Sequence, residues 1–362
     1  MIAASLPVQR PADARLLAAD ARGDLWHLAR RDFVSLLAPG DLVVANDAAT
    51  LPASLAGRHL SSGAAIEVRL AAARTLAIEE NARFTAIVFG AGDHRTKTED
   101  RVAPPPLAAG DRLALGPARA VIERLLGHPR LVEIRFEGPS HDVWSAIAHH
   151  GRPIQYAHIP ASLAMWDVWT PIAGAPLAFE PPSAGFVLDW GALSSMRSRG
   201  IGFATLTLAA GISSTGDPEL DRRLPFDEPY RIPEATARAL RRAKAAGGRV
   251  VAIGTTVVRA LESAASAPGQ VTAGEGIARV RIGAGFDLRV VDAIISGTHE
   301  PGSSHYELLR AFAGDETLRD MNDQLQANGY RTHEFGDSIF VERARAAASW
   351  RASRGERLLG AL

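Results

Sequence analysis

Cysteine is absent from all 362 residues of the sequence. Its absence excludes disulfide bonds, zinc sites built on thiolates and cysteine nucleophiles. It also suits a reducing compartment, so we expect a cytoplasmic protein. Long hydrophobic runs are missing as well, because no segment approaches the ~20 apolar residues of a membrane span. The first residues lack the basic and then apolar order of a signal peptide, and we expect no contact with a membrane.

An excess of charge of either sign is also missing, because 40 lysine and arginine residues balance 40 aspartate and glutamate residues. A net charge of zero gives no general attraction to nucleic acid, so only a local basic patch would bind RNA phosphates. Two segments are candidates, although such runs are more often solvated helix faces. They comprise Arg238, Arg241, Arg242 and Lys244 on one helix, and Arg343, Arg345, Arg351, Arg354 and Arg357 near the carboxyl terminus.

The chain does have enough apolar sequence, 47% of its residues, to build about two domains. Residues 1–57 and 141–341 alternate strand and helix patterns, which predicts an α/β main domain. Between them, residues 58–140 contain short alternating runs separated by turns, which predicts an inserted small β-barrel domain. Residues 342–362 are expected to form an arginine-rich carboxy-terminal helix.

The coarse pattern places the elements of the main domain. Strands are expected at residues 40–46, 202–208, 250–253, 277–282 and 288–295, and helices beginning near residues 142, 233, 303 and 316. Residues 152–182 form a loop rich in proline and tryptophan. A loop of this length inside a compact domain usually serves a function.

The most informative stretch is residues 249–263, where a buried strand runs directly into a helix. Gly254 allows a tight turn and a close approach to a ligand. Thr255 or Thr256 is expected to cap the helix, whose first N–H groups favour a polar or anionic ligand. Arg259 lies on the same helix and offers a planar pair of donors to a carboxylate or phosphate. The alternative is structural, with Arg259 paired to Glu262 or to a carbonyl at the sheet edge.

Polar residues follow other expected strands. His299 comes after the strand at 288–295 and before a helix that Ser303 or Ser304 would cap, where α/β folds often place their chemistry. Asn46 and Asp47 end the strand at 40–46, although both residue types are also common in turns. His299 and His305 lack a cysteine or carboxylate at metal-ligand spacing, so they are weak evidence for a metal site.

Several motifs, in order, resemble S-adenosylmethionine:tRNA ribosyltransferase-isomerases, which act in queuosine biosynthesis. They are GDLVVAN at residues 40–46 with LPA at 51–53, IEV at 66–68, IGTTVVRALES at 253–263, HEPGSS at 299–304, AFAG at 311–314 and GDSIF at 336–340. The ordered match covers most of residues 5–341. The resemblance implies an α/β domain interrupted by a small barrel, in agreement with the organisation above.

The resemblance also implies a reaction. Members of this family transfer and isomerise the ribosyl part of S-adenosylmethionine onto 7-aminomethyl-7-deazaguanine in tRNA, forming epoxyqueuosine and releasing adenine and methionine. S-adenosylmethionine is a co-substrate, tRNA is the expected partner, and no metal or redox cofactor is implied. In such a mechanism a carboxylate stabilises the sulfonium and removes a ribose C5′ proton, while an acid protonates the departing adenine.

The resemblance and the residue patterns together nominate the site. The expected catalytic residues are His299 as the acid and Glu228 or Asp47 as the carboxylate. The expected substrate-binding residues are Asn46, Glu67, Ser183, Gly185, Gly254, Thr255, Thr256, Arg259, Ser303 and Asp337. Without the resemblance, Glu67 and Asp337 would be read as a solvent-facing strand residue and a turn residue.

The chain departs from the family pattern at several positions. Family histidines are replaced by Val187, Thr207 and Phe226, and a family arginine is replaced by Ala49. These departures leave two alternatives open. One is a relative that uses S-adenosylmethionine or a similar nucleoside on a small-molecule acceptor, and the other is a nucleoside-binding protein without catalytic activity.

Overall fold

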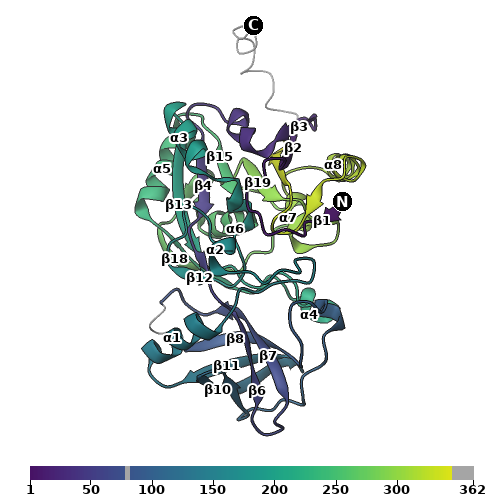
Figure 1. The fold of residues 1–362 in the computed structure, drawn as a ribbon. Coiled ribbons are helices and arrows are strands. Elements are labelled where there is room, and N and C mark those ends of the chain that lie inside the picture. The colour runs from purple at the N-terminus through teal and green to yellow at the C-terminus, as the bar shows by residue number, and fades with distance from the viewer. Residues whose placement is uncertain (78–81, 345–362) are drawn as a thin grey trace, which may run out of the picture.

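The computed structural model in Figure 1 describes residues 1–77 and 82–344. It consists of a large sheet covered by helices and, below it in this view, a small closed barrel. The predicted fold class, an α/β domain interrupted by a β-barrel, is confirmed. The helix expected at 342–362 does not begin at residue 342, because Glu342 ends strand β21 (Ser338–Glu342) and pairs with Ala293, and residues 343–344 are not helical. From position 345 onward the expected helix lies outside the described residues.

The main sheet has nine strands in the order β18-β14-β13-β4-β15-β19-β21-β2-β3. Their bounds are β2 (Arg15–Ala19), β3 (Leu25–Ala29), β4 (Leu42–Asn46), β13 (Gly202–Leu208), β14 (Glu228–Ile232), β15 (Val250–Ile253), β18 (Gly274–Ala278), β19 (Ala293–Gly297) and β21 (Ser338–Glu342). The central strands β13, β4, β15 and β19 run parallel to one another. Three two-stranded pairs accompany the sheet: β1 (Ile2–Ala3) with β20 (Arg331–Thr332), β5 (Ala49–Thr50) with β12 (Pro176–Ala178), and β16 (Ala265–Ala267) with β17 (Gln270–Val271).

Strand β15 shows why this sheet lies at the centre of the domain. All four of its residues are buried, because helices cover both faces of the sheet. Successive side chains point to opposite faces, so Val250 and Ala252 join one core while Val251 and Ile253 join the other. Helices α5 and α6 pack against the first face, and α3 with the 3₁₀ helix η1 (Arg30–Leu36) packs against the second.

The helices fill the connections between strands. They are α1 (Ser140–His150), α2 (Met165–Val168), α3 (Trp190–Ser198), α4 (Pro218–Asp221), α5 (Glu234–Ala245), α6 (Thr255–Ser263), α7 (Ser304–Leu309) and α8 (Asp315–Ala327), with short 3₁₀ turns η3 (Thr98–Asp100) and η4 (Ser183–Val187). Within the described residues, no helix combines the length and the apolar character needed to cross a membrane.

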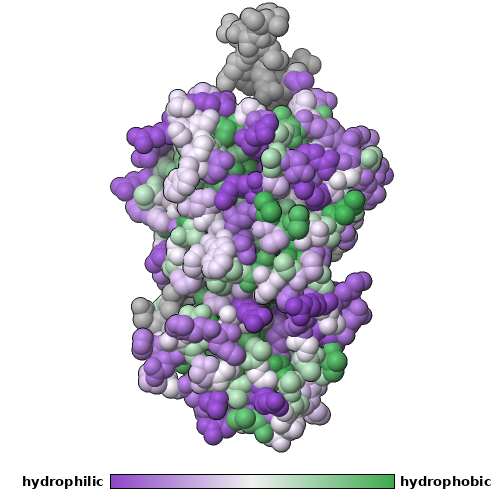
Figure 2. Space-filling view, in the orientation of Figure 1, coloured by the Kyte–Doolittle hydropathy of each residue, from purple (hydrophilic) through white to green (hydrophobic). Residues whose placement is uncertain are grey.

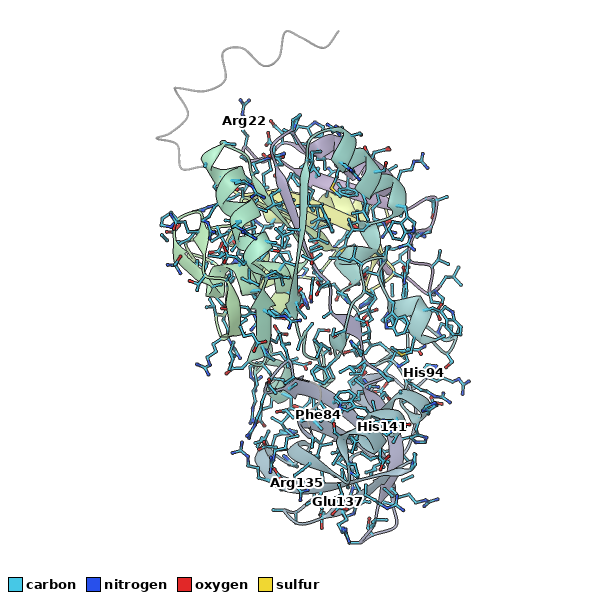
Figure 3. The ribbon with its side chains drawn as sticks, turned by 90° about the vertical axis from the view of Figure 1, so that its left-hand side faces the viewer. Arg22, Phe84, His94, Arg135, Glu137 and His141 are labelled. Atoms are coloured by element: carbon cyan, nitrogen blue, oxygen red, sulfur yellow. The ribbon has the colours of Figure 1, made fainter. Side chains whose placement is uncertain are left out.

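The barrel closes in the strand order β10-β11-β8-β7-β6-β9. Its strands are β6 (Ser54–His59), β7 (Ala65–Ala73), β8 (Arg83–Phe89), β9 (Arg112–Leu115), β10 (Ala118–His128) and β11 (Leu131–Glu137). The ring of Phe84, labelled in Figure 3, packs edge-on against Phe179 of the main domain with their centroids 6.1 Å apart. The barrel core is therefore continuous with one core of the main sheet. We propose that the inserted unit comprises residues 54–137, slightly earlier than the expected 58–140.

Two expected strands have different bounds in the structure. The strand predicted at 277–282 is β18, which ends at Ala278 because its antiparallel partner β14 begins opposite it at Glu228. The strand predicted at 288–295 is β19, which begins at Ala293. The backbone N–H groups of Val290 and Val291 donate instead to the carboxylate of Glu262, so this segment cannot pair as a strand.

Candidate active site at the carboxyl edge of the sheet

The carboxyl ends of the four parallel strands bring the predicted residues of the main domain together. Strand β4 ends at Asn46, β13 is followed by Ala209, β15 by Gly254, and β19 by Thr298 and His299. Open α/β sheets bind their ligands at this edge. Because the four strands are parallel, these segments lie at one edge of the sheet.

Gly254 makes the turn from β15 into α6 with a φ of +92°. A Cβ atom at this position would lie 3.4 Å from the Cβ of Ala184, so η4, which contains Ser183 and Gly185, packs directly on the junction. The prediction that a threonine caps α6 is wrong. Gly254 holds the cap position, Thr255 and Thr256 are already helical, and no side chain caps the first N–H groups.

Arg259 is buried and its donors are occupied within the protein. Its guanidinium pairs with the carboxylate of Glu228 and donates to the carbonyls of Phe226, Val280 and Ala278. The other oxygen of Glu228 accepts from the N–H of Gly211 at 2.7 Å. Burial raises the pKa of Glu228 above its usual value, although the charge of Arg259 opposes this. The structure therefore favours the structural alternative for Arg259 over a guanidinium that is free to bind a ligand. The carboxylate partner of Arg259 is Glu228 and not Glu262.

Asn46 and Asp47 bind neighbouring elements. The Asn46 side chain donates to the carbonyl of Leu208 at 2.9 Å and accepts from the N–H groups of Leu208 and Ala48. One oxygen of Asp47 accepts from the hydroxyl of Thr207 at 2.7 Å. Asn46 thus fixes the ends of β4 and β13, and Asp47 stands beside it, only half-buried.

Two predicted binding residues lie in buried ion pairs. Glu67, on the barrel strand β7, pairs with Arg69 and Arg101 and accepts from the hydroxyl of Ser54. Asp337 lies at the start of β21 and accepts from the backbone and side chain of Arg15 and of Arg331. In the structure both carboxylates connect elements of the fold.

His299 occupies the predicted position after β19. Its Nε2 lies 2.9 Å from the hydroxyl of Ser296, and its ring stacks on His305 with centroids 4.6 Å apart. Burial, with further lowering by the neighbouring His305 and His333, holds the pKa of His299 well below its usual value, and burial lowers that of His305 to about 4. Both imidazoles are therefore neutral at pH 7. Ser303 caps α7, as predicted, by accepting from the N–H of Tyr306.

A group of titratable side chains that the sequence analysis did not nominate lies beside this edge. It comprises Tyr156, His158, Glu180, His333 and Glu334. The hydroxyl of Tyr156 donates to the carboxylate of Glu180 and also lies 3.1 Å from the carbonyl of Ser214. Burial raises the pKa of Glu180 to about 7, although hydrogen bonds from Ser213 and Tyr156 oppose the shift. Glu180 therefore exchanges its proton near neutral pH.

The same group joins the barrel to the main domain. The guanidinium of Arg69 stands over the ring of Tyr156 at 5.7 Å and donates to the carbonyl of Gln155. Burial lowers the pKa of His333, whereas His158 and other partners hold the pKa of Glu334 below its usual value despite burial. In the sequence, only one feature indicated this group of side chains. It is the unusual length of the loop at residues 152–182, which carries Tyr156, His158 and Glu180.

Comparison with known proteins shows where this chain belongs. A family model described as queuosine biosynthesis protein matches residues 1–341. The chain belongs to the queuosine biosynthesis protein family. It is 33% identical over 335 residues to the S-adenosylmethionine:tRNA ribosyltransferase-isomerase of Thiobacillus denitrificans, and this alignment covers 91% of each protein. It is 35% identical to the enzyme of the same name from Ralstonia nicotianae, and that alignment covers 91% of this chain and 89% of the relative. A crystal structure of S-adenosylmethionine tRNA ribosyltransferase from Thermotoga maritima has 23% identity and a TM-score of 0.49, covering 94% of this chain and 96% of that one.

In this member of the queuosine biosynthesis family, the positions that depart from the motif pattern surround the same edge. Val187 is buried in η4, and the hydroxyl of Thr207 donates to Asp47. Phe226 precedes β14, and its carbonyl accepts from Arg259.

A cavity of about 550 Å³ lies between the barrel and strands β14 and β18, the last two strands at one end of the main sheet. Phe226 and Asp227 line it, together with four arginines, namely Arg74, Arg223, Arg279 and Arg281. Arg279 pairs with Asp227 at 3.2 Å, whereas Arg281 donates to the backbone carbonyls of Arg222 and Arg223. Arg74 pairs with Glu133 and Arg223 with Glu219, so all four cavity arginines have partners. The basic residues of helix α5 are paired in the same way, because Arg238 and Arg241 pair with Glu234 and Lys244 pairs with Asp292. Polar and apolar residues are interspersed over the face of the molecule shown in Figure 2.

The pKa of Glu180 has a consequence for stability in this family member. Because the native state raises this pKa from 4.5 to about 7, it binds the proton more tightly than the unfolded chain does. The contribution of Glu180 to stability is therefore present at low pH and is lost as the pH rises toward 7 and above. Relative to wild type, a Glu180→Gln variant should gain about 2–3 kcal/mol of unfolding free energy between pH 5 and pH 8.

Urea denaturation of both proteins at the two pH values measures this difference. Glu316→Gln is a matched control for the loss of one carboxylate, because Glu316 is exposed in the first turn of α8. A difference between Glu180→Gln and wild type that stays constant from pH 5 to pH 8 would show that Glu180 titrates normally.

Proposed function

We propose that the protein transfers and isomerises the ribosyl part of S-adenosylmethionine onto 7-aminomethyl-7-deazaguanine in tRNA, releasing adenine and methionine. The observation that carries this proposal is the end-to-end similarity to proteins named for this activity, at 33% and 35% identity. The arginine-lined cavity between barrel and sheet supports a substrate that carries phosphates, because arginine pairs well with phosphate oxygens.

The geometry suggests how the site would work. The uncapped N–H groups of α6, next to Gly254, Thr255 and Thr256, would hold the ribose or the methionine carboxylate. Because its pKa is near 7, Glu180 is suited to exchange a proton with the reacting nucleoside. A neutral His299 would donate or accept one hydrogen bond at the end of β19. Asp47 has one oxygen bound to Thr207, and we retain it as the carboxylate that would face the sulfonium.

The experiment that tests the function measures adenine released from S-adenosylmethionine by chromatography, with and without tRNA that carries the deazaguanine precursor. Release only in the presence of that tRNA is the expected result. Release without any tRNA would point to another acceptor. If no adenine is released under either condition while S-adenosylmethionine still binds, the protein is a binding protein and the proposed activity is wrong.

His299→Ala is expected to lower the rate of adenine release by about 100-fold, as removal of one hydrogen-bonding group that stabilises the transition state typically does. The folded state should persist, because His299 is only half-buried and makes one side-chain hydrogen bond, to Ser296. His141 is exposed on α1 beside the barrel (Figure 3), so His141→Ala serves as the control and should keep the wild-type rate. A His299→Ala rate within a few-fold of wild type would remove His299 from the mechanism.

A second function is favoured by one observation. Val187, Thr207 and Phe226 replace family histidines around one edge of the sheet, which indicates a changed pocket. The alternative activity would use S-adenosylmethionine, or a related nucleoside, with a small-molecule acceptor. The adenine assay distinguishes the two functions, because only the first requires tRNA.

A further inference from the structure

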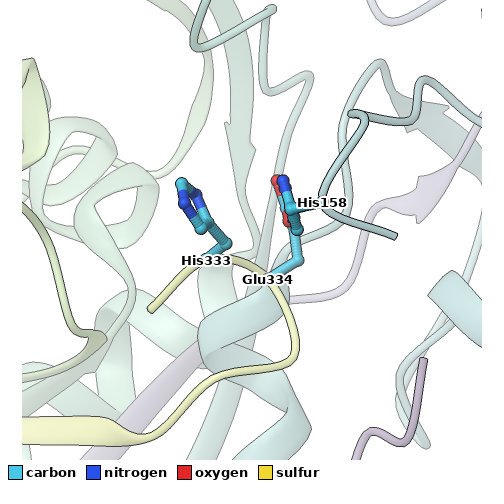
Figure 4. A group of neighbouring side chains, drawn as sticks. All are labelled: His158, His333 and Glu334. Atoms are coloured by element: carbon cyan, nitrogen blue, oxygen red, sulfur yellow. The ribbon is translucent and has the colours of Figure 1, made fainter. Parts of the chain in front are cut away.

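Three potential metal-binding side chains converge from two separate loops. His158 comes from the long loop after α1, whereas His333 and Glu334 come from the turn between β20 and β21 (Figure 4). Each residue offers one ligand atom, and these three atoms all lie within 4.8 Å of one another. The rings of His158 and His333 stack with their centroids 4.2 Å apart, and the Nε2 of His158 lies 2.9 Å from a carboxylate oxygen of Glu334.

The backbone at His333 is the second observation. His333 has a φ of +68°, and within the described part of the chain no other non-glycine residue has a positive φ. Residues other than glycine adopt a positive φ at a cost in conformational energy, and residues with this conformation are concentrated at active sites and ligand sites. Within the same residues, the His333 side chain makes no hydrogen bond, and its backbone carbonyl accepts from the N–H of Gly336 at 3.0 Å. The turn thus holds an imidazole beside a second imidazole and a carboxylate without an evident gain to the fold.

We propose that His158, His333 and Glu334 form a binding site for one divalent transition-metal ion, with Zn²⁺ as the best match. Two imidazoles and one carboxylate are a known donor set for zinc sites that keep an open position. Zinc–ligand distances are ~2.0–2.2 Å, so two ligand atoms of one ion lie no more than ~4.4 Å apart. A small rotation of the exposed His333 side chain would close the remaining gap.

The position of the site suggests what the ion would contact. The ring of His158 also stacks on Tyr156, whose hydroxyl binds Glu180. Three protein ligands leave a fourth zinc position for water or for an oxygen or nitrogen atom of a small molecule. The inference rests on the three ligand residues and is independent of the proposed transferase activity.

The test uses the full-length protein after chelator treatment and needs neither S-adenosylmethionine nor tRNA. Titration with Zn²⁺ against a chromophoric chelator should show one tightly bound equivalent. His158→Ala, His333→Ala and Glu334→Gln should each weaken this binding by ~100-fold or more. Titration with Co²⁺ should produce the intense visible absorption of a site with low coordination number, and each variant should lose it.

Matched controls come from histidines that lie elsewhere. His141 and His149 are exposed on α1, so His141→Ala and His149→Ala should bind Zn²⁺ as the wild type does. Glu334→Gln keeps the size of the side chain and a hydrogen-bond acceptor for His158, and circular dichroism would show that it folds. Two outcomes would overturn the proposal: no stoichiometric binding by the wild type, or equal binding by wild type and the His333→Ala variant. The first would leave the cluster as an ion pair that connects two loops.

Discussion

An Arg259→Ala variant is expected to lose about 3–5 kcal/mol of unfolding free energy. Arg259 and Glu228 form an ion pair in which both side chains are nearly inaccessible to water. Removing the arginine leaves the carboxylate of Glu228 buried, and among residues 1–77 and 82–344 only the N–H of Gly211 remains as its partner. It also frees the carbonyls of Phe226 and Ala278, which accept from the guanidinium. Urea denaturation at pH 7 measures the loss.

A double variant separates a structural role from a ligand-binding role. Arg259→Leu combined with Glu228→Leu removes both charges, and replacing such a pair with apolar residues is often close to neutral. The double variant should therefore recover most of the stability that Arg259→Ala loses. If Arg259→Ala instead keeps its stability within about 1 kcal/mol and raises the KM for S-adenosylmethionine, Arg259 is a ligand-binding residue. That result would support the prediction made from the sequence.

Replacing Glu67 by alanine should have an effect of similar size, about 3–5 kcal/mol, at the barrel. Glu67 is the only carboxylate that pairs with Arg69 and Arg101 among the described residues, and both guanidiniums are buried. They also stand over the ring of Phe89, at 4.7 and 5.2 Å from its centroid. Without Glu67, two buried positive charges would lie near the same aromatic ring without that carboxylate as a partner.

The pH dependence checks the origin of this loss. Burial opposes the ionisation of Glu67, yet Arg69 and Arg101 hold its pKa below the usual value. The stability that Glu67 contributes is therefore present above pH 4.5 and is lost as the pH falls through the lowered pKa. Glu123→Ala is the control, because Glu123 pairs with Arg83 and Arg135 at the surface and should contribute less than about 1 kcal/mol. Equal losses in the two variants at pH 7 would contradict the assignment.

The fold could be predicted where local pattern and long-range packing agree. The apolar run at 250–253 is buried on both faces, and the alternating runs of the inserted segment form a closed barrel. The bounds of β19 could not be predicted, because Val290 and Val291 look like strand residues but donate their N–H groups to Glu262, 28 and 29 positions earlier. A carboxylate from a distant part of the chain that accepts from backbone N–H groups leaves no local sequence pattern at those groups.

The site could be predicted only in part for a related reason. His299, Gly254 and Asn46 follow strands, and the parallel topology brings strand ends together without further information. Whether an arginine faces a ligand or a buried carboxylate depends on tertiary contacts, and Glu228 lies 31 positions before Arg259. His158 and Glu334 are 176 positions apart, so no local pattern in either segment predicts their contact.

The placement of β2 and β21 has a consequence for biosynthesis on the ribosome. Strand β21 pairs with β2, and Asp337 accepts from the backbone of Arg15, which precedes it by 322 positions. In the emerging chain β2 can pair with β3, but the other edge of β2 waits for β21, and β4 waits for β13 and β15. All six barrel strands lie within residues 54–137 and can complete one another early. We expect the barrel to fold first during translation, as contiguous units do, while the incompletely paired amino-terminal strands remain a target for chaperones until β21 has left the exit tunnel.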